Sequence, residues 1–253
     1  MIIPKLPIVF AVTLGFTSLI DLPTLGQVQS SILVSQDAST LPDPPPTPPD
    51  NKTTAGGGLN ESSQSCQSTN QTLTALIPVQ NPVLTISDYP TFWFYLPYAA
   101  EDIEFIQFSV NIRDEKTGQE KTRLYQASFQ LPGTPGIVGI SLSSVPKYAL
   151  EEGRFYHWYF KVYCKGNTSY QSDWDVNGWV QRVPATPENE RKIEAANPDI
   201  WYDALTHVAK RRLANPQDPN LKEDWTSLLE FIDRKELDQV QLIDPIVLPE
   251  PTD

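Results

Sequence analysis

Few residues in this chain have the type and spacing that a chemical site requires. Its two histidines are His157, which lies among aromatic residues, and His207, which lies beside basic ones. A metal site needs several His, Cys or carboxylate ligands that converge on one point. Neither histidine has such neighbours in the sequence, so we expect both to be packing or surface residues. We therefore predict no metal and no cofactor.

Nucleophilic and acid–base catalysis have equally weak candidates. The sequence contains neither a Gly-x-Ser-x-Gly elbow nor a His-Glu-x-x-His motif. Adjacent acids occur at Glu101-Asp102 and Glu151-Glu152, at the boundaries of predicted strands, where solvent-exposed carboxylates are common. We predict no catalytic residues, and the alternative is an envelope hydrolase that acts on glycans through a carboxylate pair.

Aromatic residues are the third candidate, because rings on an exposed sheet face can stack on sugars or anchor a protein partner. The chain has more rings than one buried sheet face needs: Phe92, Trp93, Phe94, Tyr95, Tyr98, Phe155, Tyr159, Tyr163, Trp174 and Trp179. The candidate binding surface is made of Trp93, Tyr95, Tyr159, Tyr163, Trp174 and Trp179. The alternative, which we favour, is that C-terminal helices cover this face and pack Trp201 and Trp225 against it.

The N-terminal segment predicts export. An uncharged apolar run from Ile8 to Ile20 follows the single cation Lys5 and ends before Asp21, which is typical of a signal peptide. A membrane span needs about 20 apolar residues, so we predict a signal peptide over 1–26 and no span in the mature chain; a retained anchor is the alternative. The protein is therefore expected in the periplasm or outside the cell.

A Pro-, Ser- and Gly-rich segment over 27–65 predicts a disordered linker. The net charge of −12 disfavours nucleic acid as a partner, because acidic proteins repel phosphate backbones. Cys66 and Cys164 are the only cysteines. An even pair in an oxidising compartment usually forms a disulfide, and a reactive thiol pair would need a Cys-x-x-Cys or cationic setting that neither residue has.

Short runs of β-branched and aromatic residues, separated by turn residues, predict a β-sandwich over 66–184. The fold class that we expect is mainly β with C-terminal α, an immunoglobulin- or fibronectin-III-like sandwich followed by a helical hairpin. The predicted strands are Leu73–Ile77, Val83–Ser87, Thr91–Leu96, Glu104–Ile112, Arg123–Gln130, Ile137–Leu142, Arg154–Cys164 and Trp174–Val183.

The seventh of these strands is the most informative. Alternation assigns one face to the core and the other to Phe155, His157, Tyr159, Lys161 and Tyr163. The core face consists of Tyr156, Trp158, Phe160, Val162 and Cys164. A leucine, a glycine three residues later and Tyr156 three after that resemble the tyrosine corner of immunoglobulin-like sandwiches, so we expect the Tyr156 hydroxyl to bond the backbone near Leu150.

The remaining segment, 185–253, predicts helices that pack on the sandwich. Thr186, Asn197 and Asp218 each precede a proline, the pattern of an N-cap followed by Pro at the first helical position. The two helices after Asn197 and Asp218 have apolar residues at helical spacing and form a hairpin that cannot bury its apolar face alone. A short helix at about 236–240 and an extended end follow.

Linked motifs along the chain resemble a cyanobacterial family of exported proteins known as domain of unknown function 928, over about Gly56 to Ile246. They include Tyr89-Pro-Thr-Phe-Trp-Phe-Tyr-Leu-Pro-Tyr98, Leu131-Pro-Gly-Thr-Pro-Gly-Ile-Val138, Tyr156-His-Trp-Tyr-Phe160, Gly178-Trp-Val-Gln-Arg-Val183 and Ile200-Trp-Tyr-Asp-Ala-Leu205. The resemblance implies export and a shared cysteine pair, and it implies no activity. We expect a non-catalytic module that binds a protein or polysaccharide of the envelope; the alternatives are the hydrolase and a structural accessory to secretion or envelope assembly.

Overall fold

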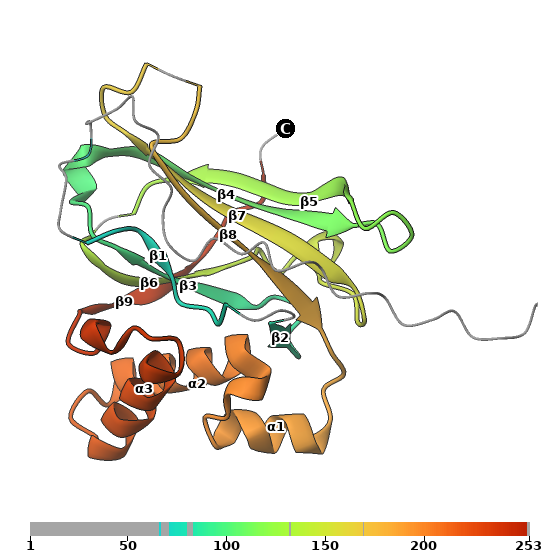
Figure 1. The fold of residues 1–253 in the computed structure, drawn as a ribbon, viewed down its shortest axis with the longest axis vertical. Helices are drawn as coiled ribbons and strands as arrows, with labels where there is room; N and C mark the ends of the chain where they lie inside the picture. Colours follow the sequence, from blue (N-terminus) through green and yellow to red (C-terminus); the bar gives the residue numbers. More distant parts are fainter. Residues whose placement is uncertain (1–65, 67–70, 80–82, 132, 169, 252–253) are drawn as a thin grey trace, which may run out of the picture. The chain divides into compact units, whose positions relative to one another are not determined.

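We describe the protein from a computed structural model, which covers residues 66, 71–79, 83–131, 133–168 and 170–251 (Figure 1). The predicted signal peptide and linker lie outside the described residues. The fold is mixed: a four-stranded and a five-stranded β-sheet are followed by three C-terminal α-helices. None of the helices in the described part of the chain is long and apolar enough to cross a membrane.

The five-stranded sheet has the strand order β2-β8-β7-β4-β5. Its long strands are antiparallel to one another, whereas the short edge strand β2 runs parallel to β8. The strands are β2 (Leu84–Thr85), β4 (Ile103–Arg113), β5 (Glu120–Phe129), β7 (Phe155–Cys164) and β8 (Trp174–Arg182).

The four-stranded sheet has the order β1-β3-β6-β9 and lies opposite the first sheet. Its strands are β1 (Thr74–Ala75), β3 (Thr91–Leu96), β6 (Gly136–Ser141) and β9 (Leu242–Val247). All eight predicted strands are present, with ends that differ by a few residues. The sequence did not predict β9, which comes from the end of the chain and pairs parallel with β6 along the edge of the sheet.

Aromatic rings from the two sheets meet in the core. Phe94 of β3 stacks on Phe160 of β7 with ring centroids 4.0 Å apart, and Phe92 lies 5.0 Å from Phe108 of β4. All five residues assigned to the core face of β7 are buried, as predicted. Gly178 of β8 is required here, because a Cβ at this position would lie 2.5 Å from Cζ2 of Trp158.

The helices begin where the sequence predicted. Thr186 caps α1 (Pro187–Glu194) and Asp218 caps α3 (Pro219–Phe231), each through a side chain that accepts from a backbone N–H of the first turn. Asn197 caps the short 3-10 helix η4 (Pro198–Ile200), which leads directly into α2 (Trp201–Ala214). Three other 3-10 helices are η2 (Ala100–Asp102), η3 (Pro146–Tyr148) and η5 (Lys235–Leu237).

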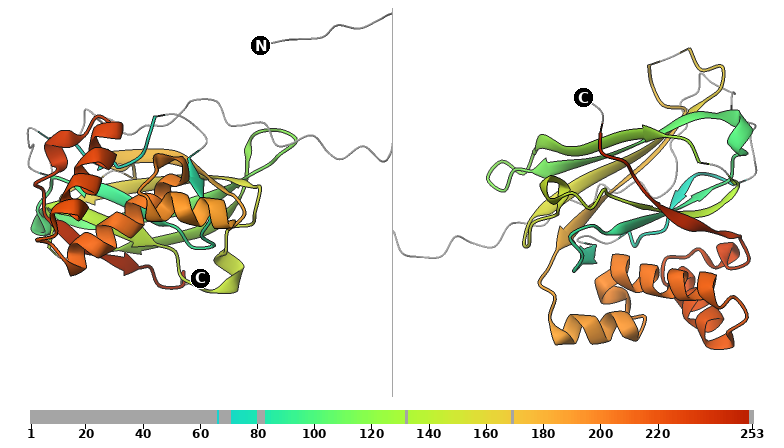
Figure 2. Two further views of the ribbon diagram at one scale, coloured as in Figure 1. Left: turned by 90° about the horizontal axis from the view of Figure 1, so that it is seen from below. Right: turned by 180° about the vertical axis from the view of Figure 1, so that it is seen from behind.

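The helical segment packs on the sandwich through α2, as the two further views show (Figure 2). The Trp201 indole donates to the carbonyl of Leu76 at 2.8 Å, and the Trp93 indole donates to the Thr206 hydroxyl at 2.9 Å. Tyr202 reaches farther in, and its hydroxyl accepts from the indole of Trp158 at 2.8 Å. The outer side of β3 is therefore buried under α2.

Candidate functional site

The six candidate surface residues do not lie on one face. Trp93 and Tyr95 point to the helical side of the four-stranded sheet, where they are 1% and 5% exposed. Trp93 is held by α2, and Tyr95 lines a small cavity beside η5. For these two residues the structure agrees with the favoured alternative, because the C-terminal segment covers this face and both side chains are buried.

Trp174 does not lie on the outer face of the five-stranded sheet either. It pairs with Val162, a core-facing residue of β7, and its ring stacks on Tyr98 at 5.5 Å. Its side chain thus closes one end of the sandwich interior. Only Tyr159, Tyr163 and Trp179 lie on the outer face of the five-stranded sheet, the face that the helices leave uncovered.

Trp179 is on this face but is not accessible, because only 7% of it is exposed. Its ring stacks on His157 with centroids 4.2 Å apart and an interplanar angle of 8°. The Arg113 guanidinium lies 5.6 Å from the ring of Phe155 and 5.8 Å from that of Trp179. His157 is therefore a packing residue, as predicted. We call the cluster of His157, Trp179, Phe155 and Arg113, at one end of the outer face, the platform.

Glu120 of β5 joins this platform to Tyr159. Its carboxylate accepts from the Tyr159 hydroxyl at 2.5 Å and from the Asn111 amide at 2.5 Å, and it pairs with His157 Nδ1 at 2.5 Å. Burial alone would raise the pKa of Glu120, but the hydrogen bonds from Tyr159, His157 and Asn111 outweigh it and hold the pKa below its ordinary value. The network fixes the Tyr159 ring on the outer face.

The partly exposed part of the face runs along β7 toward its C-terminal end. We define the outer-face strip as Phe105, Tyr159, Lys161, Tyr163 and Asp175. Lys161 stands opposite Asp175 of β8, and its ammonium lies 5.7 Å from the Tyr159 ring. Phe105 of β4 stacks on Tyr163 with centroids 4.3 Å apart at 16°. The sequence analysis missed Phe105, although its alternate position in β4 places it on the outer face.

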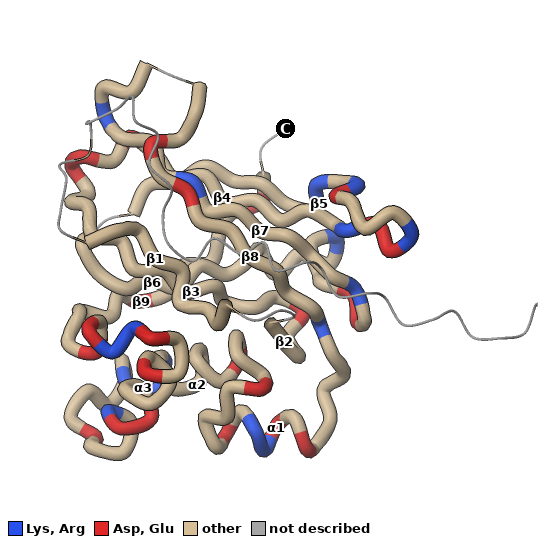
Figure 3. Tube along the Cα trace, viewed as in Figure 1, with Lys and Arg blue, Asp and Glu red and all other residues tan. Residues whose placement is uncertain are grey.

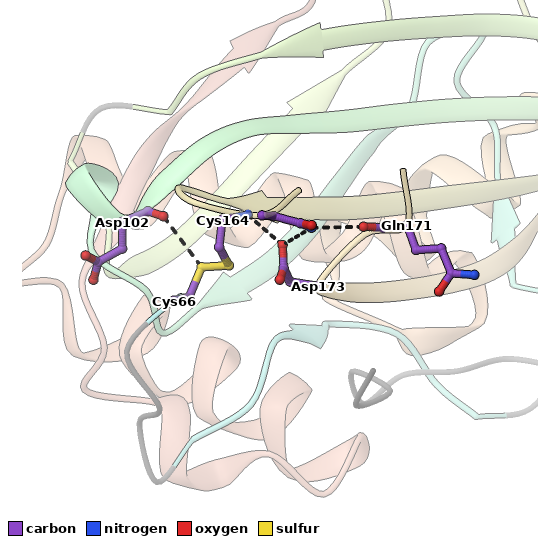
Figure 4. The surroundings of a disulfide bond; sticks show 6 residues. Cys66, Asp102, Cys164, Gln171 and Asp173 are labelled. Carbon is purple, nitrogen blue, oxygen red and sulfur yellow. Dashed lines mark hydrogen bonds between the residues drawn. A yellow bond between two sulfur atoms is a disulfide. The ribbon is translucent and has the colours of Figure 1, made fainter. Parts of the chain in front are cut away.

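Figure 4 shows how the far end of this strip is held. Cys66 and Cys164 form the predicted disulfide, with Cα atoms 5.2 Å apart. The Asp173 carboxylate accepts from the backbone N–H of Cys164 at 2.8 Å and from the amide of Asn167 at 2.7 Å. The Asp173 carboxylate therefore ties the segment before β8 to the end of β7, and the disulfide ties Cys66 to the same end.

A cavity of about 290 Å³ opens beside this loop. It is lined by Glu104, Phe105, Tyr163, Cys164, Asn167 and Tyr170. Tyr170 is fully exposed, and Phe105 and Tyr163 are partly buried. The cavity thus combines ring surfaces with a carboxylate and an amide, the mixed lining that small-ligand sites have.

Tyr156 lies in the core at the other end of β7. Its hydroxyl accepts from the backbone N–H of Glu151 at 2.8 Å, one residue from the expected position. Arg182 strengthens the same corner, because it donates to the carbonyl of Leu150 at 2.6 Å and pairs with Asp88 at 2.5 Å. Glu152 lies 3.6 Å from the same guanidinium.

One of the two pairs of adjacent acids forms ion pairs. Glu151 pairs with Arg154 at 3.2 Å, and Glu152 lies beside Arg182. His207 of α2 accepts from Arg211 at 3.3 Å on the surface of the helix. Within the described residues there is no group of three or more His, Cys, Asp or Glu side chains that could hold a metal ion.

Charge differs between the two sheets. In the four-stranded sheet only the edge strand β9 contains a charged residue, Asp244, whereas charged residues lie along the helices and on strands β4, β5, β7 and β8 of the five-stranded sheet (Figure 3). A strand buried on both faces has no place for a charge, whereas a strand with one exposed face has such places. The pattern marks the outer face of the five-stranded sheet as the solvent-facing side of the sandwich.

Comparison with known proteins gives a family without an activity. No curated protein matches the chain. The family model described as Domain of Unknown Function (DUF928) matches residues 55–242, which is most of the chain. The chain therefore belongs to the DUF928 family.

Proposed function

We propose that this protein is an exported, non-catalytic binding module whose outer-face strip engages a protein or polysaccharide of the cell envelope. The observation that carries the proposal is the strip itself. It offers partly exposed aromatic rings next to a cation and an anion, on a sheet face that none of the described helices or strands covers. Partner-binding surfaces are rich in such anchored aromatic residues with polar groups around them.

Export is supported by the apolar run near the N-terminus and by the disulfide. Disulfides persist in oxidising compartments such as the periplasm or the extracellular space. Cys66 and Cys164 are both buried, at 3% and 1% exposure, so the bond is an integral part of the folded domain. We therefore propose a periplasmic or extracellular location.

The immunoglobulin-like assignment remains part of the proposal. Three features support it: the order β1-β3-β6 opposite β8-β7-β4, the parallel pairing of an early edge strand with β8, and the hydroxyl bond of Tyr156 upstream of its strand. Strand β9 departs from this pattern, because it runs parallel to β6 at the edge.

Binding is favoured over hydrolysis because the carboxylates of this face, Glu120 and Asp175, already have hydrogen-bonding or charged neighbours. Both oxygens of Glu120 already accept hydrogen bonds, and hydrogen bonding holds its pKa low, whereas a general acid needs a raised pKa. Asp175 stands opposite Lys161. Neither carboxylate has the environment of a glycosidase acid.

Site-specific photo-crosslinking tests the proposal. A photoreactive amino acid at Gln107, which lies opposite Lys161 on β4, should give an adduct with an envelope component when the full chain is expressed and exported. The adduct should disappear in a Tyr159→Ala, Lys161→Glu double variant. The matched control places the same probe at Lys222 on the exposed side of α3, where no adduct is expected.

Two results would reject the binding strip. One is an adduct at Gln107 that the double variant leaves unchanged. The other is equal crosslinking at Gln107 and Lys222, which would mean that the probe reports random collisions.

A further inference from the structure

We propose that the cavity at the end of the outer-face strip is a subsite for a neutral sugar residue of a polysaccharide. This inference rests on the proposed binding function and names the ligand class. It concerns the cavity lined by Phe105, Tyr163, Tyr170, Glu104 and Asn167. Nothing in the family description assigns a ligand to it.

The ring surfaces of the cavity suit a sugar. Phe105 and Tyr163 stack nearly parallel, at 16°, so each ring covers only one face of the other, and both partly exposed rings line the cavity. A pyranose presents a flat patch of C–H groups that packs on such a face, while a tyrosine keeps its hydroxyl for polar contact. A cage around a quaternary ammonium needs rings that surround the cation, and two rings stacked on each other do not provide that.

The polar groups suit hydroxyls. Glu104 is an exposed carboxylate, which accepts hydrogen bonds from sugar hydroxyls. The side chain of Asn167 donates to the carbonyl of Gln171 at 3.0 Å and to Asp173 at 2.7 Å, so its amide group is positioned before a ligand arrives. A carboxylate at the cavity and a net charge of −12 disfavour an anionic sugar.

The position of the cavity favours a polymer over a free monosaccharide. Tyr163 and Tyr159 stand on the same face of β7, four residues apart, which corresponds to about 13 Å along the strand. Lys161 and Asp175 lie between them at adjacent positions. A chain that has one residue in the cavity can therefore continue along the strip.

Affinity electrophoresis of the full, oxidised protein tests the assignment. Native gels would contain one of three neutral soluble polysaccharides: a mixed-linkage β-glucan, a soluble starch or a galactomannan. We expect at least one to retard the wild-type protein. Tyr170→Ala and Tyr163→Ala should each weaken retardation about fivefold to tenfold, as expected for the loss of one stacked ring.

Matched variants control for folding and for exposed rings in general. Tyr170 is fully exposed, so its replacement leaves the core intact. Phe231→Ala removes another exposed ring, 56% exposed on α3, and should migrate as the wild type does. A thermal unfolding curve of Tyr163→Ala checks that its partly buried ring is not needed for folding.

Three outcomes would overturn the sugar subsite. They are no retardation in any of the three gels, retardation that both tyrosine variants retain, and retardation that choline chloride abolishes. If the Gln107 adduct depends on the strip while the gels show no retardation, the binding function stands and the sugar subsite is rejected. If retardation depends on Tyr170 while no Gln107 adduct forms, the sugar subsite stands without the wider strip.

Discussion

Reduction of the Cys66–Cys164 bond should lower the free energy of unfolding by up to about 4–5 kcal/mol. The bond joins residues that are 98 positions apart, and the loop that it closes includes strands β1 to β7, whereas β8 and β9 follow it. In the chain-entropy model, a cross-link stabilises by restricting the unfolded chain, and the effect grows with the logarithm of loop length. Residual structure in the unfolded chain makes this value an upper limit.

Urea unfolding followed by tryptophan fluorescence measures the effect. The six tryptophans give a strong signal, and at least four of them, Trp93, Trp158, Trp201 and Trp225, are fully buried. The reduced protein should unfold at a lower urea concentration than the oxidised protein, and its melting temperature should fall by on the order of 10 °C.

The Cys66→Ala, Cys164→Ala double variant is the control. It should unfold near the reduced wild type, with a small further loss from the missing sulfur atoms, and reductant should not change it. If complete reduction, verified by thiol alkylation, leaves the urea midpoint of the wild type in place, the reasoning is refuted, because the bond would then add no constraint.

Other substitutions test the packing. Burial raises the pKa of Asp203, although hydrogen bonds from Thr85 and from the backbone N–H of Ile86 oppose this shift. The contribution of Asp203 to stability is therefore complete below its unfolded pKa and is lost as the pH rises through its folded pKa. Asp203→Asn should therefore unfold at higher urea than the wild type at pH 7 and not at pH 3; the opposite order would contradict this. Tyr156→Phe leaves the backbone N–H of Glu151 without its acceptor and should cost about 1 kcal/mol in urea unfolding, whereas no loss would remove any role for this corner. Gly178→Ala forces a methyl group against Trp158 and should cost about 1–3 kcal/mol in the same assay. An unchanged urea midpoint would mean that the Trp158 ring moves aside and that the close contact does not require glycine.

Much of the fold follows from local sequence patterns. The alternation in Phe155–Cys164 identified the core face of β7, and the three cap-and-proline signals located the starts of α1, η4 and α3. Strand β9 was not predictable in the same way. Its segment, Leu242-Ile-Asp-Pro-Ile-Val247, contains a proline, which is disfavoured in central strands and tolerated at an edge. Only the docking of the chain end beside β6 makes it a strand.

The candidate site was only partly predictable, because a ring on a sheet face is exposed or buried according to what packs over that face. The sequence nevertheless contains a signal that separates the two sheets. The run Thr91-Phe-Trp-Phe-Tyr-Leu96 has no charged residue and is buried throughout, as in strands covered on both faces. Strand β7 interrupts its rings with His157 and Lys161, and three of its outer positions, Tyr159, Lys161 and Tyr163, are partly exposed.

This difference connects the fold to the proposed function. The helical segment uses its own rings to cover β3, so the rings of Trp93 and Tyr95 contribute to the stability of the domain and not to recognition. On the opposite sheet, Glu120 fixes Tyr159, and the loop beside the disulfide borders the cavity next to Tyr163. Since binding costs less when side chains are already ordered, these restraints favour recognition at the strip. The disulfide then has two effects, because it stabilises the domain and fixes one end of the face that we propose for binding.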